Sequence, residues 1–351
     1  MADVRPGTGL PRDMHGRQVV AAFGPEPCDT LAPMRQDNAL MAAAYEPQEE
    51  VACPMCQARS RELVMHARDR LFGRPGKYNI VRCTACDLRY LSPRPTLEGL
   101  GAHYPDDYFI YKTEEEMHPV LRRMMRVMTQ QRWSAYIKRF EGVRGPFEPS
   151  TKIVDVGCGL NDHLVALKKL RGCEGIGVDF NPKVVQYVRD VRKMPIVQGT
   201  LHDAGFADGE FDVVTMNEYL EHEPNPRGVL EEARRITKVG GHIAVEVPFS
   251  DSYPARLFKS RWSQLDAPRH LTHFTRATLG EMLRRSGYRL IHLQTFQIPM
   301  LIGMSVVQAL GHKRLGYASL FDRALVSTAS LPFLPLFPLL DEFVFAVARA
   351  E

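Results

Sequence analysis

The sequence has no long apolar run, since no window reaches the roughly 18 uninterrupted apolar residues of a membrane span. Residues 1–20 lack the continuous apolar core of a signal peptide. The net charge is only +4, and no basic patch interleaved with aromatic residues is present, so we expect no DNA partner. Internal repeats are also absent. These absences predict an ordinary soluble protein of the reducing cytoplasm, and 351 residues are enough for two domains.

Cysteine is scarce, and four of the seven cysteines stand in two CxxC pairs. A disulfide framework would be unusual in a chain of this length and apolar content. Residues 57–82 separate the pairs, which is wide enough for a hairpin, and CxxC loops at the ends of hairpins are typical of a zinc ribbon. We therefore predict one structural zinc ion in a closed thiolate shell without an open catalytic position, held by Cys53, Cys56, Cys83 and Cys86.

The chain divides into four parts. Residues 1–50 carry scattered Pro, Gly, Met and Ala without periodicity, and we expect a mostly disordered tail. Residues 51–92 are the predicted zinc ribbon, and residues 93–150 a helical linker or cap whose apolar positions from Leu121 to Phe140 keep helical spacing. Residues 151–351 are predicted to be an α/β domain with an apolar insertion at 299–340.

From residue 151 onward, apolar strands alternate with helices, which predicts a parallel sheet covered on both faces. The predicted strands are Lys152–Val156, Gly175–Asp179, Ile196–Gly199, Phe211–Met216, His242–Val247, Arg289–Phe296 and Glu342–Ala348. The predicted helices between them are Asp162–Lys169, Lys183–Asp190, Gly228–Ile236 and Arg276–Arg285.

The first two strands carry the signature of a cofactor site. Gly157 and Gly159 lack Cβ atoms, so the backbone can approach a ligand closely. Asp179 ends the second strand, where a carboxylate accepts hydrogen bonds from a ribose diol. A dinucleotide fingerprint would have glycine where this chain has Asp162, whose charge would repel a pyrophosphate. Asp155 suits a cationic or zwitterionic ligand, so the pattern favours a ribosyl cofactor without phosphates.

These motifs resemble the class I S-adenosylmethionine-dependent methyltransferases over residues 150–297. The resemblance includes the Asp155–Gly159 loop, Gly177-Val178-Asp179, Phe211-Asp212-Val213-Val214, Glu221-His222 and Val239-Gly240-Gly241. It implies a Rossmann-like, seven-stranded methyltransferase fold with S-adenosylmethionine as cofactor. It further implies that the residues that bind the cofactor are Asp155, Gly157, Gly159, Asp179, Thr200, Leu201 and Asn217. The family often has an acidic residue where this chain has Thr200, so we expect adenine contacts through backbone amides.

A zinc-binding module that precedes a methyltransferase domain is also found in the sugar C-methyltransferases and in related enzymes of polysaccharide and antibiotic gene clusters, and this chain resembles that group. This second resemblance implies methyl transfer to a small-molecule acceptor, and we favour a sugar that is nucleotide-activated or linked to a glycolipid. An RNA methyltransferase whose ribbon grips RNA is the less favoured alternative. A scaffold with a degenerate cofactor site is the third, and intact Gly157, Gly159 and Asp179 argue against it.

Candidate groups for the acceptor side follow the fourth and fifth strands, at the edge where such sheets bind ligands. His222 is the first candidate for a catalytic base, His270 the second, and Glu221 lies beside them. A structural hydrogen bond is an equally good interpretation of each histidine. Arg269 suits either a phosphate on the acceptor or a surface salt bridge. The fourth strand is not followed by Asn-Pro-Pro-Tyr or by a nucleophilic cysteine, which argues against adenine-amino and pyrimidine-C5 methylation.

The apolar stretch 299–340 is broken by Pro332, Pro335 and Pro338. We favour its packing against the sheet or against a second subunit in a homodimer. The alternative is contact with the inner membrane face or a lipid-linked acceptor, because exposed apolar patches mark interaction sites.

Overall fold

The computed structural model describes residues 47–104, 119–311, 320–333 and 340–351. The predicted tail at 1–50 therefore lies almost wholly outside the described residues, as do Pro335 and Pro338 of the insertion. No described helix is both long and apolar enough to cross a membrane.

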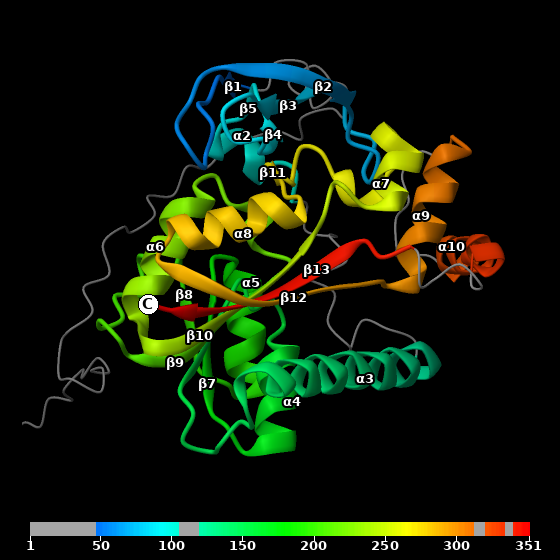
Figure 1. The fold of residues 1–351 in the computed structure, drawn as a ribbon. Helices are drawn as coiled ribbons and strands as arrows, with labels where there is room; N and C mark the ends of the chain where they lie inside the picture. The colour runs from blue at the N-terminus through cyan, green and yellow to red at the C-terminus, as the bar shows by residue number, and fades with distance from the viewer. Residues whose placement is uncertain (1–46, 105–118, 312–319, 334–339) are drawn as a thin grey trace, which may run out of the picture. The chain divides into compact units, whose positions relative to one another are not determined.

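The larger sheet has seven strands in the spatial order β12-β13-β10-β9-β6-β7-β8. Only β13 runs antiparallel to its neighbours, between β10 and β12 (Figure 1). Numbered along the chain, this order is 6-7-5-4-1-2-3, the predicted α/β Rossmann-like methyltransferase fold. The strands are β6 Ile153–Val156, β7 Gly175–Asp179, β8 Ile196–Gln198, β9 Phe211–Asn217, β10 Thr237–Pro248, β12 Tyr288–Phe296 and β13 Phe343–Ala350.

Strand and helix boundaries follow local signals that the apolar pattern alone does not give. All four residues of β6 are buried, as expected of a central parallel strand. The strand predicted at His242–Val247 starts earlier, since Thr237 already pairs with Phe211 of β9, and the pairing then shifts register between Thr237 and His242. The helices of this domain are α4 Asp162–Arg171, α5 Pro182–Tyr187, α6 Pro226–Ile236 and α8 Arg276–Arg285.

Prolines and side-chain caps set the starts of these helices. Helix α6 begins two residues before the predicted start, since Pro226 suits the first helical position and Asn225 caps the Gly228 amide. The helix predicted at Lys183–Asp190 is α-helical only to Tyr187 and continues as a π turn, η4 Val188–Arg192.

The long helix α3 Pro119–Arg144 precedes the sheet and packs on α4 through the buried residues Tyr136, Ile137 and Phe140. Its arginines fall largely off the apolar stripe, on the side that an amphipathic helix usually exposes to solvent. Arg132 departs from this, because its guanidinium bonds Glu246 at 2.7 Å and also contacts Glu218. Helix α3 is therefore tied to the ends of β9 and β10.

Residues 51–92, which we call the cysteine segment, contribute strands to a small antiparallel sheet with the order β11-β4-β3-β2. Strands β2 Arg61–Ala67, β3 Tyr78–Cys83 and β4 Arg89–Leu91 come from this segment, and β11 Thr272–His273 comes from the α/β domain. Beside them lie the two-stranded pair β1 Gln48–Glu49 and β5 Arg94–Pro95, and helix α2 Leu97–Gly101. The cysteine segment is thus joined to the α/β domain by a shared sheet (Figure 1).

Two helices lie in the described part of the apolar stretch, α9 Pro299–Ala309 and α10 Leu320–Ser330. Val307 of α9 is fully buried and packs in one apolar cluster with Leu71 of the cysteine segment and Val326 of α10. Between β10 and α8 run helix α7 Tyr253–Phe258 and two short turns, η6 Lys259–Arg261 and η7 Ser263–Leu265. Much of the described apolar surface of the stretch is covered from within the chain.

Candidate functional site

The loop after β6 contains the two glycines predicted to approach a cofactor. Gly157 and Gly159 have φ angles of +67° and +51°, in the left-handed region that favours glycine. A Cβ on Gly157 would lie 2.2 Å from Cδ2 of Tyr219, whereas one on Gly159 would meet no atom within 4 Å. Packing with Tyr219 is therefore a reason for Gly157 that the sequence did not indicate, and the open space lies at Gly159.

Asp179 ends β7 and reaches this loop directly. Its Oδ2 accepts the Gly159 amide at 3.0 Å, and its Oδ1 accepts the Asn181 amide at 2.9 Å. Burial raises the pKa of Asp179. Each carboxylate oxygen keeps a second lone pair, so the side chain can still accept hydrogen bonds from a ligand.

Asp155 is anchored inside the protein by polar side chains from neighbouring elements. Its Oδ1 accepts the Thr215 hydroxyl at 2.6 Å and the Asn217 amide at 3.3 Å, and its Oδ2 lies 3.4 Å from Nδ1 of His163. Trp133 of α3 packs on the His163 ring with centroids 5.0 Å apart. Sequence analysis missed His163, since a single histidine early in a helix carries no distinguishing signal.

Unpartnered polar atoms surround the glycine loop. Asn161 is fully buried, and neither its amide oxygen nor its nitrogen has a hydrogen-bond partner among the described residues. The Asn217 side-chain oxygen is also buried without a hydrogen-bond partner among the described residues. Such atoms cost about 1–3 kcal/mol each when unsatisfied. A ligand bearing ammonium, carboxylate and hydroxyl groups, such as S-adenosylmethionine, would supply their partners.

Thr200 and Leu201 follow β8, as the sequence predicted. The Thr200 amide and hydroxyl both donate to Asp203, at 2.9 and 2.7 Å. Asp203 therefore provides a carboxylate close to the position where Thr200 replaces the expected acidic residue. The Leu201 side chain is fully buried in the core, which leaves its backbone as the part able to face a ligand.

The three candidates on the acceptor side come together, although His270 lies far along the chain from the other two. The His222 and His270 rings have centroids 4.5 Å apart. One oxygen of Glu221 and one nitrogen of each histidine lie within 4.8 Å of one another. The Leu271 amide donates to the Glu221 carbonyl at 2.8 Å, which holds the two loops side by side.

Burial controls the charges in this group. Burial and the neighbouring His270 lower the pKa of His222 to about 3, and burial lowers the pKa of His270 to about 4. Burial also raises the pKa of Glu221 well above its usual range. Both histidines are therefore neutral at physiological pH and have a free lone pair.

Arg269 takes neither of the two roles that the sequence suggested. Its side chain is fully buried, and it forms a two-pronged ion pair with Asp69, at 3.1 and 3.0 Å. Its Nε also donates to Asp266 at 2.9 Å. Arg269 is therefore a structural link to the cysteine segment, with its carbonyl 3.1 Å from Nδ1 of His222.

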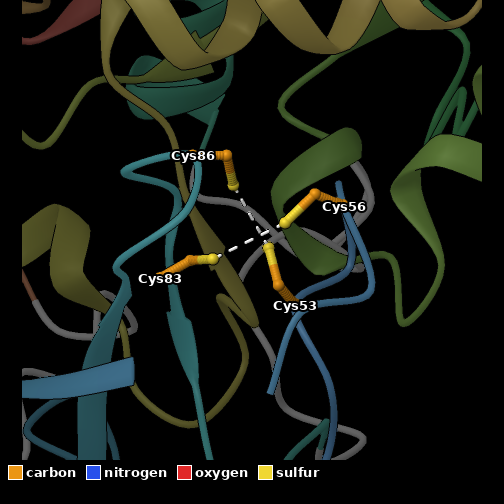
Figure 2. Close-up of side chains that lie close together, drawn as sticks. All are labelled: Cys53, Cys56, Cys83 and Cys86. Atoms are coloured by element: carbon orange, nitrogen blue, oxygen red, sulfur yellow. Dashed lines mark hydrogen bonds between the residues drawn. The ribbon is translucent and has the colours of Figure 1, made fainter. Parts of the chain in front are cut away.

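The four cysteines predicted to bind zinc converge. The Cys53 and Cys86 sulfurs are 3.4 Å apart and the Cys56 and Cys83 sulfurs 3.6 Å apart, and Figure 2 shows all four pointing inward. The two loops fold alike, since the Gln57 and Asp87 amides each bond the carbonyl of the first cysteine of their pair. Four thiols in this arrangement match the donor set of a tetrahedral zinc site.

Comparison with known proteins agrees with the fold. A family model described as a methyltransferase domain matches residues 125–293. Together with the strand order and the glycine loop, this match identifies a class I S-adenosylmethionine-dependent methyltransferase domain within the chain.

Three similar proteins show how much of the chain is matched and at what sequence identity. Demethylmenaquinone methyltransferase of Staphylococcus saprophyticus is 34% identical over 99 residues, 26% of this chain and 42% of that protein. The Bacillus subtilis enzyme of the same name is 30% identical over 142 residues, 38% and 58% of the two chains. A solved methyltransferase from Archaeoglobus fulgidus has 19% identity, a TM-score of 0.43, and coverage of 63% and 94%. The chain thus spans about half the length of these two curated relatives.

Proposed function

We propose that this protein transfers a methyl group from S-adenosylmethionine to a small-molecule acceptor, and that the acceptor is a sugar, nucleotide-activated or linked to a glycolipid. The observation that carries the proposal is that a cofactor loop and a cluster of ionisable side chains lie at the same edge of the sheet. The glycine loop with Asp179 would hold the cofactor, and Glu221, His222 and His270 would face the acceptor.

The cofactor roles follow from the atoms that remain available. Asp179 would accept hydrogen bonds from the ribose, the space at Gly159 would admit the ligand, and Asn161 and Asn217 would meet its polar groups. S-adenosylmethionine supplies the electrophilic methyl group, and the chain's own residues position the nucleophile in line with it.

A neutral imidazole can accept a proton if the acceptor must lose one. His222 is the first candidate for this base, since Tyr104 and the Arg269 carbonyl both contact its Nδ1, at 3.0 and 3.1 Å. His270, whose Nδ1 lies 2.8 Å from the Gln264 carbonyl, is the second candidate, and Glu221 completes the group.

The four cysteines would hold one structural zinc ion. The zinc would stabilise the small sheet, and through β4 and β11 that sheet supports the loop that carries Arg269 and His270. A four-thiolate shell offers no open position for catalysis.

The proposal is tested with cofactor labelled in its methyl group and a panel of acceptors. We expect label on a nucleotide sugar or a glycolipid, and none on transfer or ribosomal RNA. Because two similar proteins are demethylmenaquinone methyltransferases, a demethylated quinone belongs in the panel. Label on RNA or on the quinone alone would contradict the sugar assignment, and label on none of the acceptors in a chain that binds the cofactor would favour a scaffold.

A further inference from the structure

Glu221 is the least expected side chain in the candidate site. It is 1% exposed, and neither of its carboxylate oxygens has a hydrogen-bond partner in the part of the chain that the structure describes. An unpaired buried carboxylate is costly, and buried charges are normally paired or coordinate a metal. Two imidazoles, those of His222 and His270, lie close enough to share a metal ion with it.

The two histidines are oriented as metal ligands usually are. Nδ1 of His222 lies 3.1 Å from the Arg269 carbonyl, and Nδ1 of His270 lies 2.8 Å from the Gln264 carbonyl. A ring that donates its Nδ1 proton to a carbonyl keeps the Nε2 lone pair for another partner, and metal-bound histidines almost always show this arrangement. Nε2 of His270 is 4.0 Å from Asp266, which is too long for a hydrogen bond.

The loops that carry these groups are firmly held. The Leu271 amide bonds the Glu221 carbonyl at 2.8 Å, and the His270 amide bonds the Asp266 carbonyl at 3.0 Å. Between them, the fully buried Arg269 is anchored by Asp69. The donor atoms lie within 4.8 Å of one another. Ligands about 2.1 Å from a shared ion stand roughly 3–3.5 Å apart, so small side-chain rotations would close the shell.

We propose that Glu221, His222 and His270 form a second metal site, distinct from the four cysteines. Two imidazoles and one carboxylate suit a first-row divalent cation such as Zn²⁺, Mn²⁺, Fe²⁺ or Co²⁺, whereas Mg²⁺ and Ca²⁺ prefer shells of oxygen. Three protein ligands leave positions open, as in catalytic sites. The site rests on the proposed function for its role: it would bind an oxygen of the methyl acceptor and would replace His222 as the group that activates it.

The test is metal content and Co²⁺ binding in the full-length protein. After saturation with Zn²⁺ and removal of the excess, we expect two equivalents in the wild type and one in Glu221→Gln and in His270→Gln. Titration with Co²⁺ should show a loss of at least about 100-fold in affinity at the second site of both variants, since even a supporting residue is worth 10–100-fold. Thiolate-to-cobalt absorption, which only the cysteine site can give, should be unchanged.

Glu342→Gln is the matched control, because Glu342 is also fully buried with two unpartnered carboxylate oxygens but belongs to no such cluster. It should keep both equivalents. One equivalent in the saturated wild type, or two in Glu221→Gln, would overturn the proposal. S-adenosylhomocysteine binding, measured on the same samples, reports on the proposed function separately: intact binding with a single metal equivalent refutes the second site alone.

Discussion

Arg269 and Asp69 form a two-pronged ion pair in which both side chains are fully buried, although 200 residues separate them. Burial alone would raise the pKa of Asp69, but His103 and Arg269 hold it below its usual range. The pair joins the end of β2 in the cysteine segment to the loop that supports His222 and His270. The small sheet is therefore part of the candidate site's support.

Replacing Asp69 by Asn should destabilise the protein by about 3–5 kcal/mol, because it leaves the Arg269 charge buried and only partly paired. Urea unfolding would measure the change. Glu231→Gln is the control, since Glu231 pairs with Arg227 on an exposed helix face and such pairs contribute about 0.3–0.5 kcal/mol. A loss below 1 kcal/mol in Asp69→Asn would contradict the structural role of the pair.

Replacing Cys83 by Ser should abolish zinc binding at the four-cysteine site and unfold the small sheet. Structural zinc contributes about 10–16 kcal/mol to the folding of small zinc-finger peptides. Elemental analysis and limited proteolysis would report the two effects. The control is Cys173→Ser, at a buried cysteine that is not part of the cluster and whose thiol donates to the Glu148 carbonyl; this variant should keep its zinc. Equal zinc content in both variants would exclude the site.

The two glycines of the cofactor loop should respond differently to Ala. Both adopt left-handed angles, which cost a residue with a Cβ about 1–2 kcal/mol. Only Gly157 would also place its Cβ 2.2 Å from Tyr219, and overpacking adds about 1–3 kcal/mol. Denaturant unfolding should therefore show a larger loss for Gly157→Ala than for Gly159→Ala. The reverse order would show that Tyr219 does not pack where the structure places it.

Glu342 should make stability depend on pH. Burial raises its pKa from 4.5 to about 8, so the folded chain keeps this proton to higher pH than the unfolded chain. The contribution of this group to stability is complete below pH 4.5 and is lost as the pH rises toward 8, at about 1.4 kcal/mol per pH unit. Glu342→Gln should gain stability relative to the wild type between pH 5 and pH 8. An equal difference in unfolding free energy between Glu342→Gln and the wild type at pH 5 and at pH 8 would contradict the raised pKa.

The features that could be predicted from the sequence are those that depend on residues close together along the chain. Strand and helix alternation, the Gly157 loop and the two CxxC loops are local patterns, and the strand order follows from the resemblance that they carry. The pairing of β11 with β4 and the Arg269–Asp69 pair depend on segments far apart in the chain, so no local pattern reveals them. For the same reason, His222 and His270 were each predicted, but their ring contact was not.

Calorimetric titration of the full-length protein with S-adenosylhomocysteine tests the central claim most directly. We expect one binding site per chain. Asp179→Asn should weaken it by roughly 10- to 150-fold, because a hydrogen bond to a charged group contributes about 1.5–3 kcal/mol. Asp208→Asn, at an exposed carboxylate paired with Arg235, should bind as the wild type does. Absence of binding to the wild type, or unchanged affinity in Asp179→Asn, would contradict the assignment of this edge of the sheet as the cofactor site.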